Sequence, residues 1–171
     1  MNVERHLLQI DRLAGGRHAD YTISEEMRTN AKTRSAFVAI TWLLAAEFVL
    51  GIAAVVVAVV LQSRGEDVPW VVWMRSVVVF GMTITLFYFA WRAQHGYYWA
   101  YSRLRLFSKI FPIVALVTAA IPGLYPLWMI TEQIVFSLIL LGISDYLSTD
   151  HMREAFPKPP KAPRASKRAN R

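Results

Sequence analysis

The sequence predicts an all-α polytopic membrane protein, a bundle of four transmembrane helices with both termini cytoplasmic. Hydrophobic residues make up 55% of the 171 residues and charged residues only 18%, whereas soluble domains average about 45–50% and about 25%. The apolar residues lie in four stretches, and lysine and arginine gather outside them. We therefore expect a cytoplasmic N-terminal segment (1–34), a membrane domain (35–147) and a disordered, basic, proline-rich tail (148–171).

The first two apolar stretches cover residues 36–61 and 70–91. Each is long enough to cross the roughly 30 Å hydrocarbon core at about 1.5 Å per residue. The second begins with Trp70 and ends with Trp91, which is typical of interfacial anchors. Charges occur throughout the residues before the first stretch, so we expect that stretch to be a retained span and not a cleaved signal peptide.

The third and fourth stretches are expected to form a close helical hairpin. A third span that began at Ile110 would reach only about 22 Å, so we place it at residues 104–124 with its basic residues extended outward to the interface. Proline and glycine at 122–126 predict a tight reversal, and the fourth span follows at 127–147. A single re-entrant element in place of these two spans would leave the tail on the same side, so the charge pattern does not decide between the two.

The distribution of lysine and arginine predicts the orientation. Six precede the first stretch, four lie between the second and third, and seven follow the fourth, while the other connections contain only Arg64. Because cytoplasmic segments carry the excess of these residues, both termini are expected in the cytoplasm. The simplest setting is the plasma (inner) membrane of a bacterium.

Two helices are predicted before the first span. Apolar residues recur at helical spacing within residues 2–13, which favours a short amphipathic helix. Thr22 followed by Glu25 fits a capping box. That box would start a second helix, which could run continuously into the first span.

Glu47 lies near the middle of the first stretch and is its only ionisable residue. It shares a helix face with Gly51, Ala54 and Ala58, and small residues let another helix approach closely, so we expect this face to meet protein rather than lipid. Because an ionised carboxylate is costly at that depth, we expect Glu47 to be protonated, paired or next to a wet cavity.

Two interpretations of Glu47 follow from this position. It could be a proton- or cation-coupling group, because an ionisable residue inside a membrane is a functional candidate. It could instead be a neutral acid that forms a hydrogen bond with Thr83 or Thr85, which lie at a similar depth on the second span. The segment AAEFVLG around Glu47 resembles the first helix of small multidrug resistance transporters, four-helix proteins with a membrane-embedded glutamate. The resemblance implies the coupling role, but the long tails and the long basic loop of this chain depart from that family.

Arg75 and Glu132 are a second candidate pair. Each lies five residues into a span that starts on the outer side, roughly 7–8 Å below that surface. A salt bridge between spans two and four is expected, unless Arg75 instead extends to the outer headgroups. Gln133, with serines further along the fourth helix, predicts hydrogen bonds between helices. Glu47 should lie about 13 Å deeper than Glu132, too far for shared acid–base work.

An aromatic and basic segment joins spans two and three and suits a loop or short helix in the headgroup region. Its candidate contacts with lipid or a partner are Trp91, Arg92, Tyr97, Tyr98, Trp99, Arg103 and Arg105. A base-stacking surface for nucleic acid would have a similar composition, but the flanking spans favour an interfacial belt. In the tail, electrostatic attraction to the anionic inner leaflet is expected from Lys158, Lys161, Arg164, Lys167 and Arg168.

Several classes of function are excluded by composition. The chain has no cysteine, which excludes disulfide scaffolds and thiolate metal sites. None of its four histidines lies inside a span, which argues against haem held in the bundle. It also lacks a glycine-rich phosphate loop, HExxH and GxSxG. We expect a non-enzymatic accessory or assembly subunit without cofactor, with a protein partner or as a homo-oligomer; the alternative is a small proton- or ion-coupled transporter or channel that uses Glu47.

Overall fold

The structure is a computed structural model that describes residues 21–159. This part of the chain is helical and contains no strand; the helix expected at residues 2–13 lies outside it. The six described helices are α2 (Glu25–Thr29), α3 (Ala31–Ser63), α4 (Trp70–Gln94), α5 (Tyr98–Ala119), α6 (Leu127–Ser148) and α7 (Asp150–Ala155).

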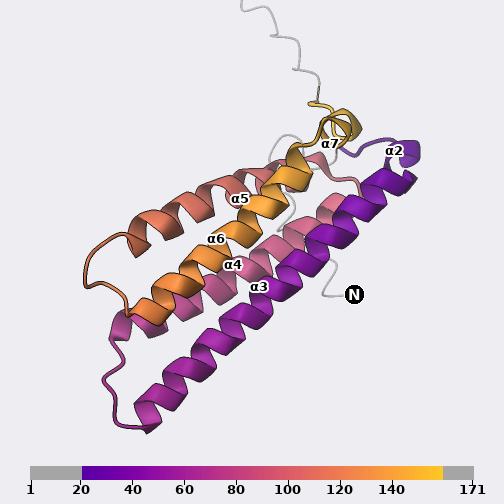
Figure 1. Ribbon diagram of the computed structural model, residues 1–171. Helices are drawn as coiled ribbons and strands as arrows, with labels where there is room; N and C mark the ends of the chain where they lie inside the picture. The colour runs from indigo at the N-terminus through magenta and orange to yellow at the C-terminus, as the bar shows by residue number, and fades with distance from the viewer. Residues whose placement is uncertain (1–20, 160–171) are drawn as a thin grey trace, which may run out of the picture.

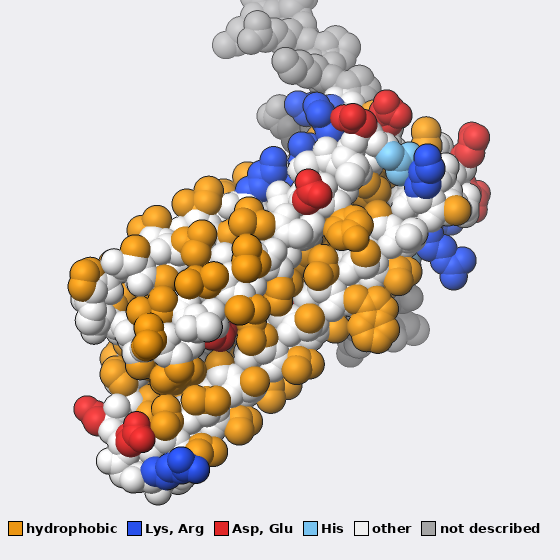
Figure 2. Space-filling model, viewed as in Figure 1, with side chains coloured by type: hydrophobic (Ala, Val, Ile, Leu, Met, Phe, Trp, Pro, Cys, Tyr) orange, Lys and Arg blue, Asp and Glu red, His pale blue; other side chains and the backbone are white. Residues whose placement is uncertain are grey.

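The four long helices, α3 to α6, lie side by side and alternate in direction (Figure 1). Each contacts the next along the chain, and α6 also contacts α3, so the helices form a closed ring. The short helices α2 and α7 and the turn between α4 and α5 lie at one end (Figure 1). Basic side chains gather at that end (Figure 2). This basic end carries Arg28, Lys32, Arg34, Arg92, Arg103, Arg105, Arg153 and Lys158.

Apolar side chains fill the interior of the ring and also cover its outside. Leu44, Leu86 and Leu140 are almost completely buried. Large apolar side chains nevertheless remain on the surface, as Figure 2 shows along the length of the helices; Trp42 and Val77 are each 73% exposed. A contiguous apolar surface of this extent is unsuited to water and suited to lipid.

Three helices, α3, α4 and α6, are long and apolar enough to cross a membrane. They coincide with the first, second and fourth predicted spans, so the prediction of an all-helical chain is confirmed for the described residues, and three of its four predicted spans are helices that could cross a membrane. Helix α5 has a comparable length of 22 residues but carries Arg103, Arg105 and Lys109, which lower its mean hydropathy. It also begins at Tyr98 and ends at Ala119, several residues before each predicted bound of the third span.

The aromatic segment between α4 and α5 is neither the separate loop nor the separate short helix predicted for the headgroup region. Most of it extends the two helices, and only residues 95–97 turn the chain. Gly96 makes this turn possible, because its φ of +90° is a conformation that residues with a Cβ rarely adopt. The turn is held against the segment before α2, since the amide of Ile23 donates to the carbonyl of Gly96 at 3.0 Å. Residues far apart in the sequence thus close the basic end.

The N-terminal prediction of a capping box is wrong. Thr22 forms an isolated bridge with Tyr97, and Ser24 precedes α2 without a capping side-chain bond. The expected continuous helix is interrupted at Asn30, whose extended ψ of 131° ends α2. Its side chain then accepts a hydrogen bond from the amide of Lys32 at 2.9 Å, which caps α3.

The first residues of the tail that was predicted to be disordered are instead helical. Residues 150–155 form α7, and Met152, Ala155 and Phe156 are buried. The ring of Phe156 stacks on Tyr101 of α5 with centroids 4.3 Å apart, and the Tyr101 hydroxyl donates to the carbonyl of Leu147 at 2.7 Å. These contacts fold the chain after α6 back onto the bundle.

Candidate functional site

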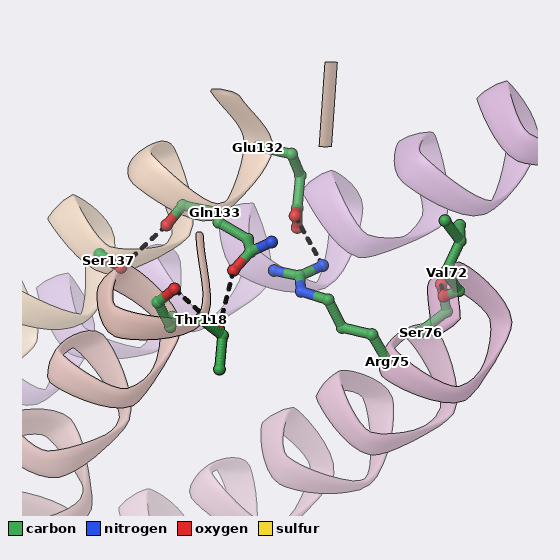
Figure 3. Close-up of polar contacts among 8 residues, drawn as sticks. Val72, Arg75, Ser76, Thr118, Glu132, Gln133 and Ser137 are labelled. Atoms are coloured by element: carbon green, nitrogen blue, oxygen red, sulfur yellow. Dashed lines mark hydrogen bonds and ion pairs between the residues drawn. The ribbon is translucent and has the colours of Figure 1, made fainter. Parts of the chain in front are cut away.

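An ion pair joins α4 and α6 inside the bundle. The Nη1 atom of Arg75 lies 2.7 Å from Oε2 of Glu132, and the two side chains are only 10% and 7% exposed. Each residue follows the start of its helix by five positions, which places them at the same level because α4 and α6 run in the same direction. Figure 3 shows the guanidinium pointing to the carboxylate. The salt bridge expected from the sequence is present.

Arg75 does not extend toward the end of the bundle. Its guanidinium carbon lies 5.9 Å from the ring centroid of Phe136, which is one turn further along α6 than Glu132. Its Nη2 atom is buried and has no hydrogen-bond partner among residues 21–159. A buried pair of this kind makes each partner depend on the other, because removal of one leaves an uncompensated charge.

Beside this pair, polar side chains link α5 to α6. The Thr118 hydroxyl lies 2.9 Å from the Ala115 carbonyl and 3.2 Å from the Gln133 amide oxygen, and Ser137 donates to the carbonyl of Gln133 at 2.8 Å (Figure 3). The Gln133 Nε2 group has no partner within the described residues. The Thr118 hydroxyl has one proton and can donate it to only one of these two oxygens. If the Gln133 amide is flipped, its nitrogen donates to the Thr118 hydroxyl and its oxygen points elsewhere.

Glu47 occupies the face of α3 that the sequence predicts. It is 1% exposed, and Ala54 and Ala58 on the same face are also buried. Gly51 lies against α4, since a Cβ atom at this position would make an ordinary van der Waals contact of 3.7 Å with the ring of Phe80. This face therefore meets protein, as expected.

The hydrogen bonds expected for Glu47 are not formed. Neither carboxyl oxygen has a partner in the described part of the chain. Thr83 donates to the carbonyl of Val79 within its own helix, and Thr85 is exposed and donates to Gly81. Thr85 misses Glu47 because it lies two residues from Thr83 and so turns to another face of α4.

Glu47 also lies within electrostatic range of the ion pair. The charges of both Glu132 and Arg75 act on its carboxyl group. Within the described residues, the ion pair joins only Arg75 and Glu132, and Glu47 forms no hydrogen bond to either of them.

The aromatic residues of the basic end divide into buried and exposed groups. Trp99 is only 4% exposed and packs edge-on against Phe89 at 5.9 Å, so its predicted contact with lipid is wrong. Trp91 is 43% exposed. The Arg92 guanidinium lies 5.0 Å from the Trp91 ring centroid and 4.9 Å from that of Tyr97, a cation–π arrangement.

Other predicted contact residues remain at the surface of the basic end. Arg103 is exposed, Arg105 donates to Ser148 at 3.3 Å, and Lys158 lines a groove with Tyr98. Lys161, Arg164, Lys167 and Arg168 lie outside the described residues. Between residues 21 and 159 no group of three or more His, Asp or Glu side chains is placed to hold a metal ion.

Comparison with known proteins adds no relative. No family model matches this chain, and neither a curated protein nor a solved structure matches it significantly.

Proposed function

We propose that the protein is a four-span membrane protein, with α5 as the fourth span beside α3, α4 and α6. The apolar half of α5 supports this, because Ile113 and Val117 are each 61% exposed, comparable to Val49 on α3 at 63%. Helix α5 also contacts both α4 and α6, so it shares their environment. Its basic half would reach the interface through long, flexible side chains.

We further propose that the basic end, and with it both termini, lies in the cytoplasm of a bacterial cell, because the excess of lysine and arginine lies there. The wild-type chain has no cysteine, so a Glu66→Cys variant carries a single thiol in the loop at the opposite end. We expect a membrane-impermeant maleimide to label it in intact cells. A second variant, Arg103→Cys, should be labelled only after the membrane is opened, and the reverse pattern would contradict the orientation.

The function we propose is that of a non-enzymatic accessory or assembly subunit of a membrane complex. One observation carries it: the basic end is an ordered, grooved surface and not a set of loose connections. A groove of about 580 Å³ lies between α5 and α7, and is lined by Tyr98, Tyr101, Arg105, Asp150, Arg153, Glu154, Phe156 and Lys158. Aromatic rings beside both signs of charge suit a protein partner.

Crosslinking in native membranes followed by affinity purification tests this function. We expect a partner to be recovered in a defined ratio, and we expect an Arg153→Glu variant to reduce its recovery about tenfold or more, because like charges across an interface are repelled. An Arg64→Glu variant at the opposite end is the matched control and should have no effect. Recovery of the protein alone, as a uniform oligomer, would contradict the proposal.

A second candidate function is proton- or ion-coupled transport through Glu47. The observation that favours it is the complete burial of both carboxyl oxygens without a partner in the described residues, within range of Arg75 and Glu132. A buried unpaired polar group is costly to stability, and such groups are often retained for function.

A further inference from the structure

A second groove lies at the basic end, between α2, the first turns of α3 and the last turn of α4. Its volume is about 770 Å³, within the roughly 300–1,000 Å³ range of small-molecule sites. It is lined by Arg28, Thr29, Arg34, Phe37, Val38, Thr41, Trp42, Gln94 and His95. A smaller polar hollow, which shares Arg28 and His95, adjoins it.

The lining of this groove changes from cationic to apolar along α3. Arg28 and Arg34 are exposed at its outer part, and Trp42 is 73% exposed at its inner part. Trp42 follows Arg34 by eight residues, about 12 Å along a helix. That distance leads from the headgroup level to the upper acyl chains of a bilayer leaflet.

Polar groups close to the level of Trp42 are already oriented. The Gln94 side chain donates to the Thr41 hydroxyl at 3.1 Å, which joins α4 to α3 across the groove. A ring nitrogen of His95 lies 2.8 Å from the Trp91 carbonyl. The groove thus has a cationic outer part, an apolar wall along α3 that includes Val38 and Trp42, and a fixed polar pair at the level of Trp42.

We propose that this groove binds one anionic phospholipid, with its phosphate at Arg28 and Arg34 and an acyl chain along Val38 and Trp42. Guanidinium groups match phosphate because they donate several hydrogen bonds in one plane. The apolar part distinguishes a lipid from a soluble phosphate ester, since Trp42 offers it an exposed surface within the hydrocarbon region. The inference relies on the proposed placement of the basic end at the membrane surface but not on its orientation or on a partner.

Glu25 pairs with Arg28 in the cationic part of the groove. It lies 3.3 Å from Arg28 and is 83% exposed, so the pair is weak in water. Phosphate and Glu25 would compete for the same guanidinium. A Glu25→Gln variant should therefore bind the lipid more tightly, by about fivefold if one full charge contact of about 1 kcal/mol is freed.

The test is a titration of the full chain in neutral detergent micelles with dioleoylphosphatidylglycerol, and bound lipids are counted by native mass spectrometry. We expect one lipid to bind far more tightly than the rest. The Arg28→Gln/Arg34→Gln variant should weaken it about 30-fold, from two contacts of about 1 kcal/mol each. The matched control Arg103→Gln/Arg153→Gln removes the same charge from the same end and should change binding by less than about threefold.

Two further measurements identify the ligand. Trp42→Ala should weaken binding about fivefold through lost apolar contact, whereas Trp70→Ala, an equally exposed tryptophan at the opposite end, should not. Soluble glycerol phosphate should not compete. Equal losses in the two double arginine variants, no loss in Trp42→Ala, or competition by glycerol phosphate would each overturn the proposal. Because the assay contains no partner and no membrane orientation, its failure leaves the proposed subunit function intact.

Discussion

Replacement of Glu132 with leucine is expected to lower the free energy of unfolding by about 3–5 kcal/mol. The reason is that Arg75, which lies 2.7 Å from Glu132 and is only 10% exposed, would remain buried without its counter-charge. Equilibrium unfolding in mixed detergent micelles with increasing sodium dodecyl sulfate measures the change. Glu66→Leu, in the exposed loop between α3 and α4, is the matched control and should be nearly neutral.

A double variant separates the cost of the lone arginine from other effects of the leucine. In Arg75→Met/Glu132→Leu both charges are gone, and an apolar pair of similar volume fills the space between α4 and α6. We expect most of the lost stability to return. A loss below about 1 kcal/mol for Glu132→Leu alone would contradict an obligate pair. It would indicate that Arg75 turns to Glu47, the other carboxyl within its range.

Replacement of Glu47 with glutamine is expected to abolish proton-linked flux in reconstituted vesicles if the second candidate function holds. The amide keeps the size and burial of the side chain but cannot bind and release a proton. Flux is followed with a pH-sensitive dye trapped in the vesicles. Glu66→Gln makes the same chemical change outside the bundle and should keep full flux. Proton-linked flux that survives Glu47→Gln unaltered would exclude this mechanism.

A Glu47→Leu variant separates the two candidate functions, because its stability should rise in both cases while its partner recovery and its flux should differ. Both carboxyl oxygens are buried without a partner in the described part of the chain, so Glu47→Leu should raise the free energy of unfolding by about 1–3 kcal/mol. For an accessory subunit, the more stable variant should still recover its partner at the wild-type ratio. For a transporter, the gain in stability would accompany a loss of flux.

Much of the membrane domain could be predicted from the sequence, because the length of a helix and the depth of a residue within it are both proportional to the number of residues counted along the helix. Helix α6 begins at Leu127, as the proline-rich turn before it predicts. The same counting placed Arg75 and Glu132 at one level, and the structure joins them. The buried face of Glu47 follows from the small residues at helical spacing. In each case the position of a residue along its own helix supplies the information needed.

The basic end was harder to predict because its contacts join distant segments. The bridge between Thr22 and Tyr97 replaces the predicted capping box, and nothing near Thr22 in the sequence indicates this partner. The stack of Phe156 on Tyr101 likewise orders residues whose composition favours disorder. Two local signals were available, since Asn30 favours a helix start and Gly96 favours a tight turn.

The short apolar half of α5 has a consequence for the surrounding bilayer. Beyond Lys109, residues 110–119 of α5 span about 15 Å, whereas residues 36–61 on α3 span about 39 Å. With α5 in the membrane, hydrophobic mismatch therefore varies around the circumference of the protein. The bilayer beside α5 must become thinner, or the side chains of Arg105 and Lys109 must stretch to the interface. The longer apolar segment of α3 must instead tilt. The protein should prefer thin regions of membrane, and the side of α5 is where a neighbouring helix would relieve the greatest distortion.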